Sequence, residues 1–214
     1  MIIIKICGIT SLAAAQAAKE SGADLLGFVF ADSRRRIELN AAQKIARAVK
    51  GIGKVGVFVN APLAEVQEIA GQCQLDFVQL HGDETPEYCR AVKHPVIKAV
   101  RIGSGFDIAD IEAYDVDWVL LDSLVPGQYG GTGVAFAWND AQTLRWRLKN
   151  RVMVAGGLTP ENVGEAIRIL SPDGVDVSGG VETNGTKDSE KIYRFIQAVR
   201  AAQRGGGNAE NHFS

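Results

Sequence analysis

The sequence predicts an α/β protein with one domain, a (β/α)8 TIM barrel. Short apolar runs and helix-like segments alternate strictly along the 214 residues, about eight times. Strict alternation predicts right-handed crossovers and a parallel sheet. Eight such units in a chain near the lower size limit of this fold, roughly 200 residues, predict a closed barrel with short loops. Several apolar runs also end in a polar residue or in glycines, as at the active rim of such a barrel.

The expected strands are apolar runs of four to seven residues. In chain order they span residues 2–7, 24–30, 54–59, 76–80, 95–100, 117–121, 151–155 and 174–177. In the first strand the period of two places Lys5 and Cys7 on the side that faces the barrel interior. The isoleucines at positions 2, 4 and 6 then face the helix layer.

The expected helices follow the strands one by one. They span residues 11–21, 40–50, 62–73, 85–93, 107–114, 139–149, 160–170 and 189–203. Start and stop signals support them, since capping residues precede helices and glycine ends them. These signals are Thr10 or Ser11 with Gly22 as the stop, then Asn40, Pro62, Thr85 with Pro86, and Thr159. The barrel domain is expected over residues 1–203, with a polar, Gly-rich and flexible tail over residues 204–214.

Four aspartates form a weak internal repeat. Asp24, Asp76, Asp117 and Asp173 each stand at or just before the start of an even-numbered strand. These positions lie at the amino-terminal ends of the strands, the face of such barrels that contributes stability. We therefore expect the four carboxylates to be structural.

Composition and charge exclude several classes of partner. Hydrophobic residues make up 46% and charged residues 22% of the chain, and the formal net charge is −2. No basic surplus indicates nucleic acid, and no apolar run reaches the roughly 18 residues of a membrane span. The three cysteines form no CxxC pair, which favours a reducing, cytoplasmic location and argues against structural zinc.

The carboxyl ends of the strands carry the residues suited to chemistry. Cys7 and Asp122 each end an apolar strand and form a candidate acid–base pair. Cys73 and Cys89 fall in helices and are expected to be small buried hydrophobes. Making Cys7 a thiolate at neutral pH costs roughly 2 kcal/mol, and Lys5 on the same face could remove part of this cost. Glycines in residues 128–133, just after Asp122, predict a loop that closes over bound substrate.

Two small-residue turns predict a phosphate site. Gly156 and Gly157 connect the seventh strand to a helix, and Ser178 and Gly179 follow the eighth. Backbone N–H groups in such turns bind anions, and these two loops are the usual phosphate site of the barrel. Together with the acid–base pair of Cys7 and Asp122, this phosphate site predicts an isomerase of a small phosphorylated sugar that needs no cofactor or metal.

Two further features of the same rim are less specific. Residues 34–36 are three arginines, one of which could bind a second anion through its guanidinium fork. His81 could be an acid, a base or a hydrogen-bonding residue. It lacks a partner at metal-ligand spacing, so we expect no metal.

From Ile3 to about Ala201 the chain carries an ordered set of motifs, which are KICGIT, GFVF, VGVFVN, VQLHG, LLDS with YGGTG, AGGL and DVSGGVE. Together these motifs resemble the N-(5'-phosphoribosyl)anthranilate isomerase family of tryptophan biosynthesis. The resemblance implies an aldose–ketose isomerisation, the Amadori rearrangement of N-(5-phosphoribosyl)anthranilate to 1-(2-carboxyphenylamino)-1-deoxy-D-ribulose 5-phosphate.

The resemblance also implies residue roles. Cys7 would be the general base, Asp122 the general acid with a pKa raised by burial, and Arg35 the contact to the anthranilate carboxylate. The backbone around Gly156, Gly157, Ser178 and Gly179 would bind phosphate, together with one hydroxyl, where the family often has two serines. Arg35 is chosen by alignment through Ser33 and Ile37, and Arg34 or Arg36 is the alternative.

Two other functions remain open from the sequence. One is another phosphate-binding barrel, a sugar-phosphate isomerase or epimerase, which would be expected to use a metal or two aspartates. The other is a catalytically inactive barrel that serves as a binding module. The expected partner is a phosphorylated small molecule, and the assembly is a monomer or a homodimer.

Overall fold

The computed structural model describes residues 1–102, 109–123 and 148–206, and it confirms the (β/α)8 barrel. Eight parallel strands close in sequence order, and β1 pairs with β8 through the register of Ile4 with Val175. The strands are β1 (Ile3–Cys7), β2 (Leu25–Val29), β3 (Gly53–Phe58), β4 (Phe77–Leu80), β5 (Val96–Ile102), β6 (Trp118–Ser123), β7 (Arg151–Ala155) and β8 (Gly174–Val177).

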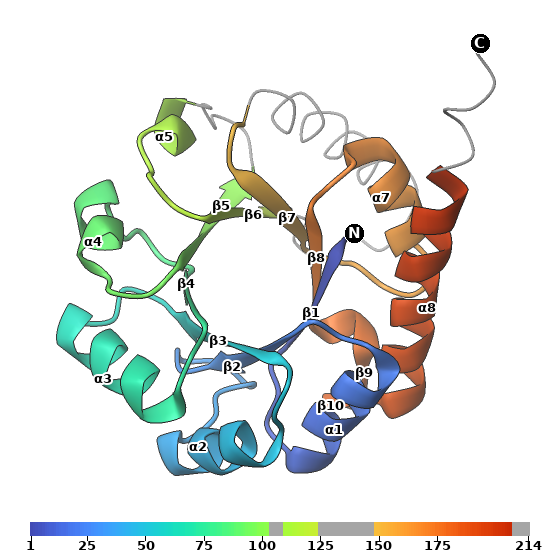
Figure 1. Cartoon of the computed structure of the whole chain (residues 1–214), viewed down its shortest axis with the longest axis horizontal. Coiled ribbons are helices and arrows are strands. Elements are labelled where there is room, and N and C mark those ends of the chain that lie inside the picture. The colour runs from blue at the N-terminus through green and yellow to red at the C-terminus, as the bar shows by residue number, and fades with distance from the viewer. Residues whose placement is uncertain (103–108, 124–147, 207–214) are drawn as a thin grey trace.

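Helices surround this ring of strands (Figure 1). They are α1 (Leu12–Ser21), α2 (Leu39–Ala48), α3 (Leu63–Cys73), α4 (Pro86–Ala91), α5 (Ala109–Glu112), α7 (Val163–Leu170) and α8 (Ser189–Gly206). The loop expected over 128–133 lies outside the described residues. So does most of the helix expected over 139–149, and its two described residues, 148 and 149, are not helical. The described part of the expected tail, residues 204–206, continues α8.

The helix ends follow local hydrogen bonding, and Gly22 ends α1 as the sequence predicted. Ser11 Oγ accepts from Ala14 N at 3.2 Å, and Thr85 Oγ1 accepts from Tyr88 N at 3.3 Å, so both caps are confirmed. Two expected caps are wrong. Asn40 lies inside α2, and α7 begins three residues late because Asn162 closes the turn that starts at Thr159.

One element was not expected, an antiparallel pair between β8 and α8. A 3-10 turn, η1 (Gly179–Val181), leads into β9 (Glu182–Thr183), which pairs with β10 (Thr186–Lys187). Asn184 and Gly185 connect them with φ of 53° and 78°. Asn-Gly is the strongest short hairpin signal because both residues tolerate positive φ, so the sequence did contain the information.

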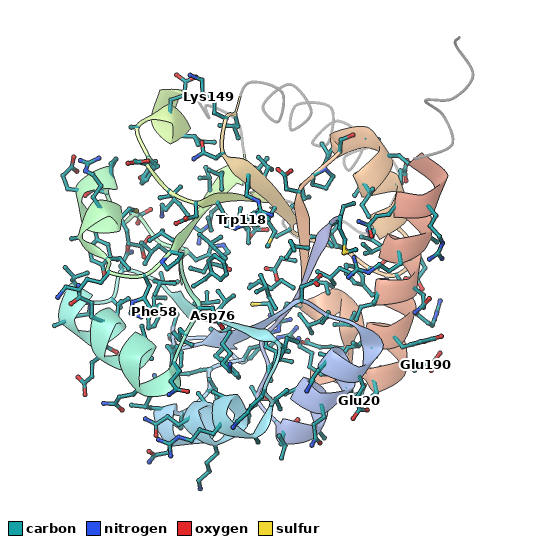
Figure 2. All side chains as sticks on the ribbon, in the orientation of Figure 1. Glu20, Phe58, Asp76, Trp118, Lys149 and Glu190 are labelled. Atoms are coloured by element: carbon teal, nitrogen blue, oxygen red, sulfur yellow. The ribbon has the colours of Figure 1, made fainter. Side chains whose placement is uncertain are left out.

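The core has two layers, as the alternation of side chains along each strand requires. One layer lies between strands and helices and contains Ile4 and Ile6. The other fills the barrel, where side chains crowd the ring of strands around Trp118 (Figure 2). Lys5 lies inside the barrel and is completely buried, as the period of two in β1 predicted.

The four aspartates are structural, as expected. Each accepts a hydrogen bond from a backbone N–H at the start of the preceding odd-numbered strand, at 2.7–3.0 Å between N and Oδ2. The pairs are Asp24 with Ile4, Asp76 with Lys54, Asp117 with Val96, and Asp173 with Val152. The same device therefore joins four strand pairs at the amino-terminal end of the barrel.

Candidate active site

The opposite end of the barrel holds a cavity of about 430 Å³, lined by residues from the ends of several strands. All eight residues that the sequence singled out line this cavity, so their convergence on one rim is confirmed. Its volume falls within the usual range for small-molecule sites, about 300–1,000 Å³. Its floor and walls divide into four groups of contacts.

The first group surrounds Cys7. The thiol is buried. Lys5, two residues earlier in β1, donates from Nζ to Asp176 Oδ1 at 3.0 Å. The pKa of the Cys7 thiol lies above its ordinary value, because burial raises it more than the positive charge of Lys5 lowers it, and Asp176 raises it further. Burial also acts against the charge of Lys5, but Asp176 and Cys7 raise the pKa of that ammonium above its ordinary value, so Lys5 remains charged. The site therefore holds a thiol and a fixed cation side by side.

The second group surrounds Asp122 at the end of β6. Its Oδ2 lies 3.1 Å from His81 Nε2, and His81 Nδ1 lies 3.0 Å from Gln79 Nε2. Gln79 donates in this arrangement, so Nδ1 accepts and Nε2 carries the proton toward the carboxylate. The Asp122 side chain is 30% exposed, so the described residues bury it only in part.

Gln79 is a site residue that the sequence analysis missed. It is buried and lines the cavity, and its Oε1 has no hydrogen-bond partner within the described residues. The sequence did point to Gln79, because the period of two places it on the same side as His81, just after β4. A buried amide in an apolar strand also needs hydrogen-bond partners.

The third group joins the arginines to the β9–β10 hairpin. Glu182 accepts from Arg35 through both carboxylate oxygens, at 2.6 and 3.0 Å, from Lys187 at 2.6 Å and from Arg34 at 3.1 Å. Burial acts against the charge of Glu182, but hydrogen bonds from Arg35 and Lys187 lower its pKa to about 2. Glu182 was missed as an anchor because it lies 147 positions from Arg35 in the chain.

The fourth group is the pair of small-residue turns. Gly156 and Gly157 adopt φ of 84° and 64°, which only glycine takes without strain. A Cβ on Gly180 would collide with the backbone oxygen of Leu158, so the two turns pack backbone against backbone. Gly179 and Gly180 open η1, where the first N–H groups have no intrahelical acceptor and can bind an anion.

The Ser178 hydroxyl is already engaged. Its Oγ donates to the Cys7 backbone oxygen at 3.0 Å and accepts from Lys187 Nζ at 3.2 Å. For the expected contact to phosphate, the Ser178 hydroxyl proton would have to leave the Cys7 backbone oxygen and turn to the phosphate. Backbone N–H groups are thus the donors that the turn offers most directly.

The comparisons with known proteins agree with this geometry. The family model for N-(5'phosphoribosyl)anthranilate (PRA) isomerase matches residues 4–198. The chain belongs to the phosphoribosylanthranilate isomerase family. A family member from Moorella thermoacetica is 46% identical over 205 residues, which cover 95% of this chain and 92% of that protein.

Solved structures of the family superimpose closely. The enzyme from Thermotoga maritima gives a TM-score of 0.83 at 39% identity, over 94% of this chain and all of that chain. A structure of phosphoribosyl anthranilate isomerase in complex with reduced 1-(o-carboxyphenylamino)-1-deoxyribulose 5-phosphate gives 0.80 at 36% identity, with the same coverage. Family membership favours the isomerase over the other phosphate-binding barrels considered from the sequence.

None of the helices described is both long and apolar enough to cross a membrane. Within residues 1–102, 109–123 and 148–206, no three His, Cys, Asp or Glu side chains group as ligands for a metal ion.

Proposed function

We propose that the chain converts N-(5-phosphoribosyl)anthranilate to 1-(2-carboxyphenylamino)-1-deoxy-D-ribulose 5-phosphate, the isomerisation of the phosphoribosylanthranilate isomerase family in tryptophan biosynthesis. The observation that carries this proposal is that Cys7 and Asp122 line one cavity together with both glycine turns. An acid, a base and an anion site in one cavity are what an aldose–ketose isomerisation of a sugar phosphate needs.

The proposed mechanism begins with Asp122 as the general acid. Its protonated carboxyl gives a proton to the furanose ring oxygen, and the bond from that oxygen to C1' breaks, which leaves a Schiff base. The Cys7 thiolate then takes the proton from C2', and the electron pair of that C–H bond forms the C1'–C2' double bond of an enolamine. The enolamine tautomerises to the ketone, and no cofactor takes part.

His81 supports this role as the hydrogen-bonding partner of Asp122. With its Nε2 proton toward Asp122, His81 stabilises the carboxylate that the acid becomes after it has given its proton. Asp122 must carry a proton at the start of the reaction. We infer that bound substrate covers the exposed side of Asp122 and excludes water there.

The anion contacts divide between the two sides of the cavity. We assign the phosphate to the backbone of Gly156, Gly157, Ser178 and Gly179, and the anthranilate carboxylate to Arg35. Glu182 accepts from Nε and Nη2 of Arg35, so among the described contacts Nη1 is the nitrogen that we assign to the substrate carboxylate. The proposed activity resides in residues 1–203, in a cytoplasmic monomer or homodimer.

Turnover of phosphoribosylanthranilate, followed by the fluorescence change of the anthranilate group, tests the proposal. The purified protein is assayed with a metal chelator present. Turnover with chelator supports the isomerase without a metal. A folded protein that shows no turnover would instead be an inactive barrel, and the proposal would be wrong.

A further inference from the structure

Lys5 is a buried cation that the proposed function has not used. It has no exposed surface, and it is among the largest completely buried side chains in the described residues. It stands on the inner face of β1, two residues before Cys7. A buried ammonium is costly unless paired, so its neighbours indicate what it does.

Gly27 brings the thiol and the ammonium together. A methyl group on residue 27 would lie 2.9 Å from Cys7 Sγ and 3.2 Å from Lys5 Nζ. Both atoms therefore pack against the bare backbone of β2 at the same point. Any larger residue there would push between them.

The hydrogen-bond donors of the two nearby lysines differ. Lys187 Nζ has three acceptors for its three N–H groups, the Ser178 oxygen, the Ser178 hydroxyl and Glu182. Lys5 Nζ donates one N–H group to Asp176, and Cys7 Sγ is the second polar atom packed beside it at Gly27. Lys5 is thus the cation with donors to spare for a thiolate.

We propose that Lys5 is the positioning residue of the general base, the counter-ion that keeps Cys7 available as a thiolate. Asp176 holds the ammonium in place, and Gly27 provides the space that lets it touch the sulfur. This inference rests on the proposed function, because only a general base needs to be ionised. Within the described residues, the other cations near the thiol are Lys187 and Arg35, both paired with Glu182.

The test measures the ionisation of Cys7 directly. The rate of iodoacetamide alkylation at Cys7 is followed against pH, with peptide mass spectrometry to separate it from Cys73 and Cys89. The test variant, Lys5→Met with Asp176→Asn, removes both buried charges at nearly constant shape. Because Lys5 lowers the pKa of the Cys7 thiol more than Asp176 raises it, we expect the alkylation midpoint to rise by a few tenths of a pH unit or more, with alkylation at neutral pH at least about twofold slower.

Two further variants separate charge from structure. Lys98→Met with Glu84→Gln removes another buried lysine–carboxylate pair, whose Nζ and Oε2 are 2.8 Å apart, and should leave the Cys7 midpoint unchanged. Gly27→Ala keeps every charge but separates sulfur from ammonium, and should raise the midpoint. If the Lys5 double variant does not fold, the alkylation midpoint of Gly27→Ala tests the proposal in its place.

The outcomes are distinguishable. The kcat/KM of the Lys5 double variant should fall at neutral pH and recover as the pH is raised, which a purely structural role would not produce. Unchanged midpoints in that variant and in Gly27→Ala, or an equal shift in the Lys98 control, would overturn the role of Lys5. An alkylation shift in a protein whose wild type does not turn over would leave the coupling intact and refute the proposed function.

Discussion

The two ends of the barrel are built on different rules. At the amino-terminal end, one hydrogen bond between an aspartate and a backbone N–H is repeated at four strand pairs. Among the described residues, no contact repeats at the carboxyl-terminal end. Cys7 lies beside a lysine, Asp122 beside a histidine, and Arg35 against a glutamate from a hairpin.

The difference separates stability from chemistry. A repeated contact satisfies the same backbone need at each strand, and each copy can be lost with a similar small effect. At the carboxyl-terminal end the buried Gln79 Oε1 also has no hydrogen-bond partner within the described residues, a feature that a stability-driven design would avoid. Substitutions should therefore affect activity at one end and stability at the other.

The largest expected effect is at Cys7. Cys7→Ala should lower kcat by roughly 10²–10⁴-fold with KM little changed, because a positioned base contributes about this much. Steady-state kinetics measures it, with Cys89→Ala as the control for loss of a buried thiol from helix α4. A fall of less than about tenfold would remove Cys7 from the role of base.

Strand β6 carries an aspartate near each end, which makes a matched pair. Asp122→Asn keeps its shape but has no comparable proton to give, so turnover should fall at least about 10²-fold while a product analogue still binds. Asp117→Asn keeps an acceptor for Val96 N and should retain wild-type kcat. Equal losses in the two variants would contradict the division between the ends.

Arg35 tests the substrate side of the same rim. Arg35→Ala should raise KM by about tenfold or more and change kcat less, because a charge-assisted contact contributes about 1.5–3 kcal/mol to binding. Arg36→Ala is the control, since Arg36 is exposed and pairs only loosely with Glu38, at 4.0 Å. If Arg34→Ala or Arg36→Ala shows the KM effect instead, the alignment of the three arginines is wrong.

Local patterns predicted much of this molecule. The alternation of side chains in β1 correctly predicted that Lys5 lies inside the barrel. The positions of four aspartates at the starts of strands correctly predicted their structural role. Contacts between distant residues could not be predicted in this way. The sequence around Arg35 does not indicate that Glu182 is its partner. The sequence around Ser178 likewise does not indicate that its hydroxyl binds the Cys7 backbone oxygen, 171 positions away.

The smallest expected effect is at the amino-terminal end. Asp76→Ala removes one exposed hydrogen bond, from Lys54 N to Asp76 Oδ2 at 2.7 Å, and should lower the free energy of unfolding by about 1 kcal/mol. Asp76→Asn retains an acceptor and should lower it less. Denaturant unfolding measures both, and kcat should stay at the wild-type value in each, because the contact lies at the far end of the barrel from the cavity. A drop in kcat without a loss of stability would show that the two ends are coupled, and the aspartates would then belong to the chemistry as well as to the fold.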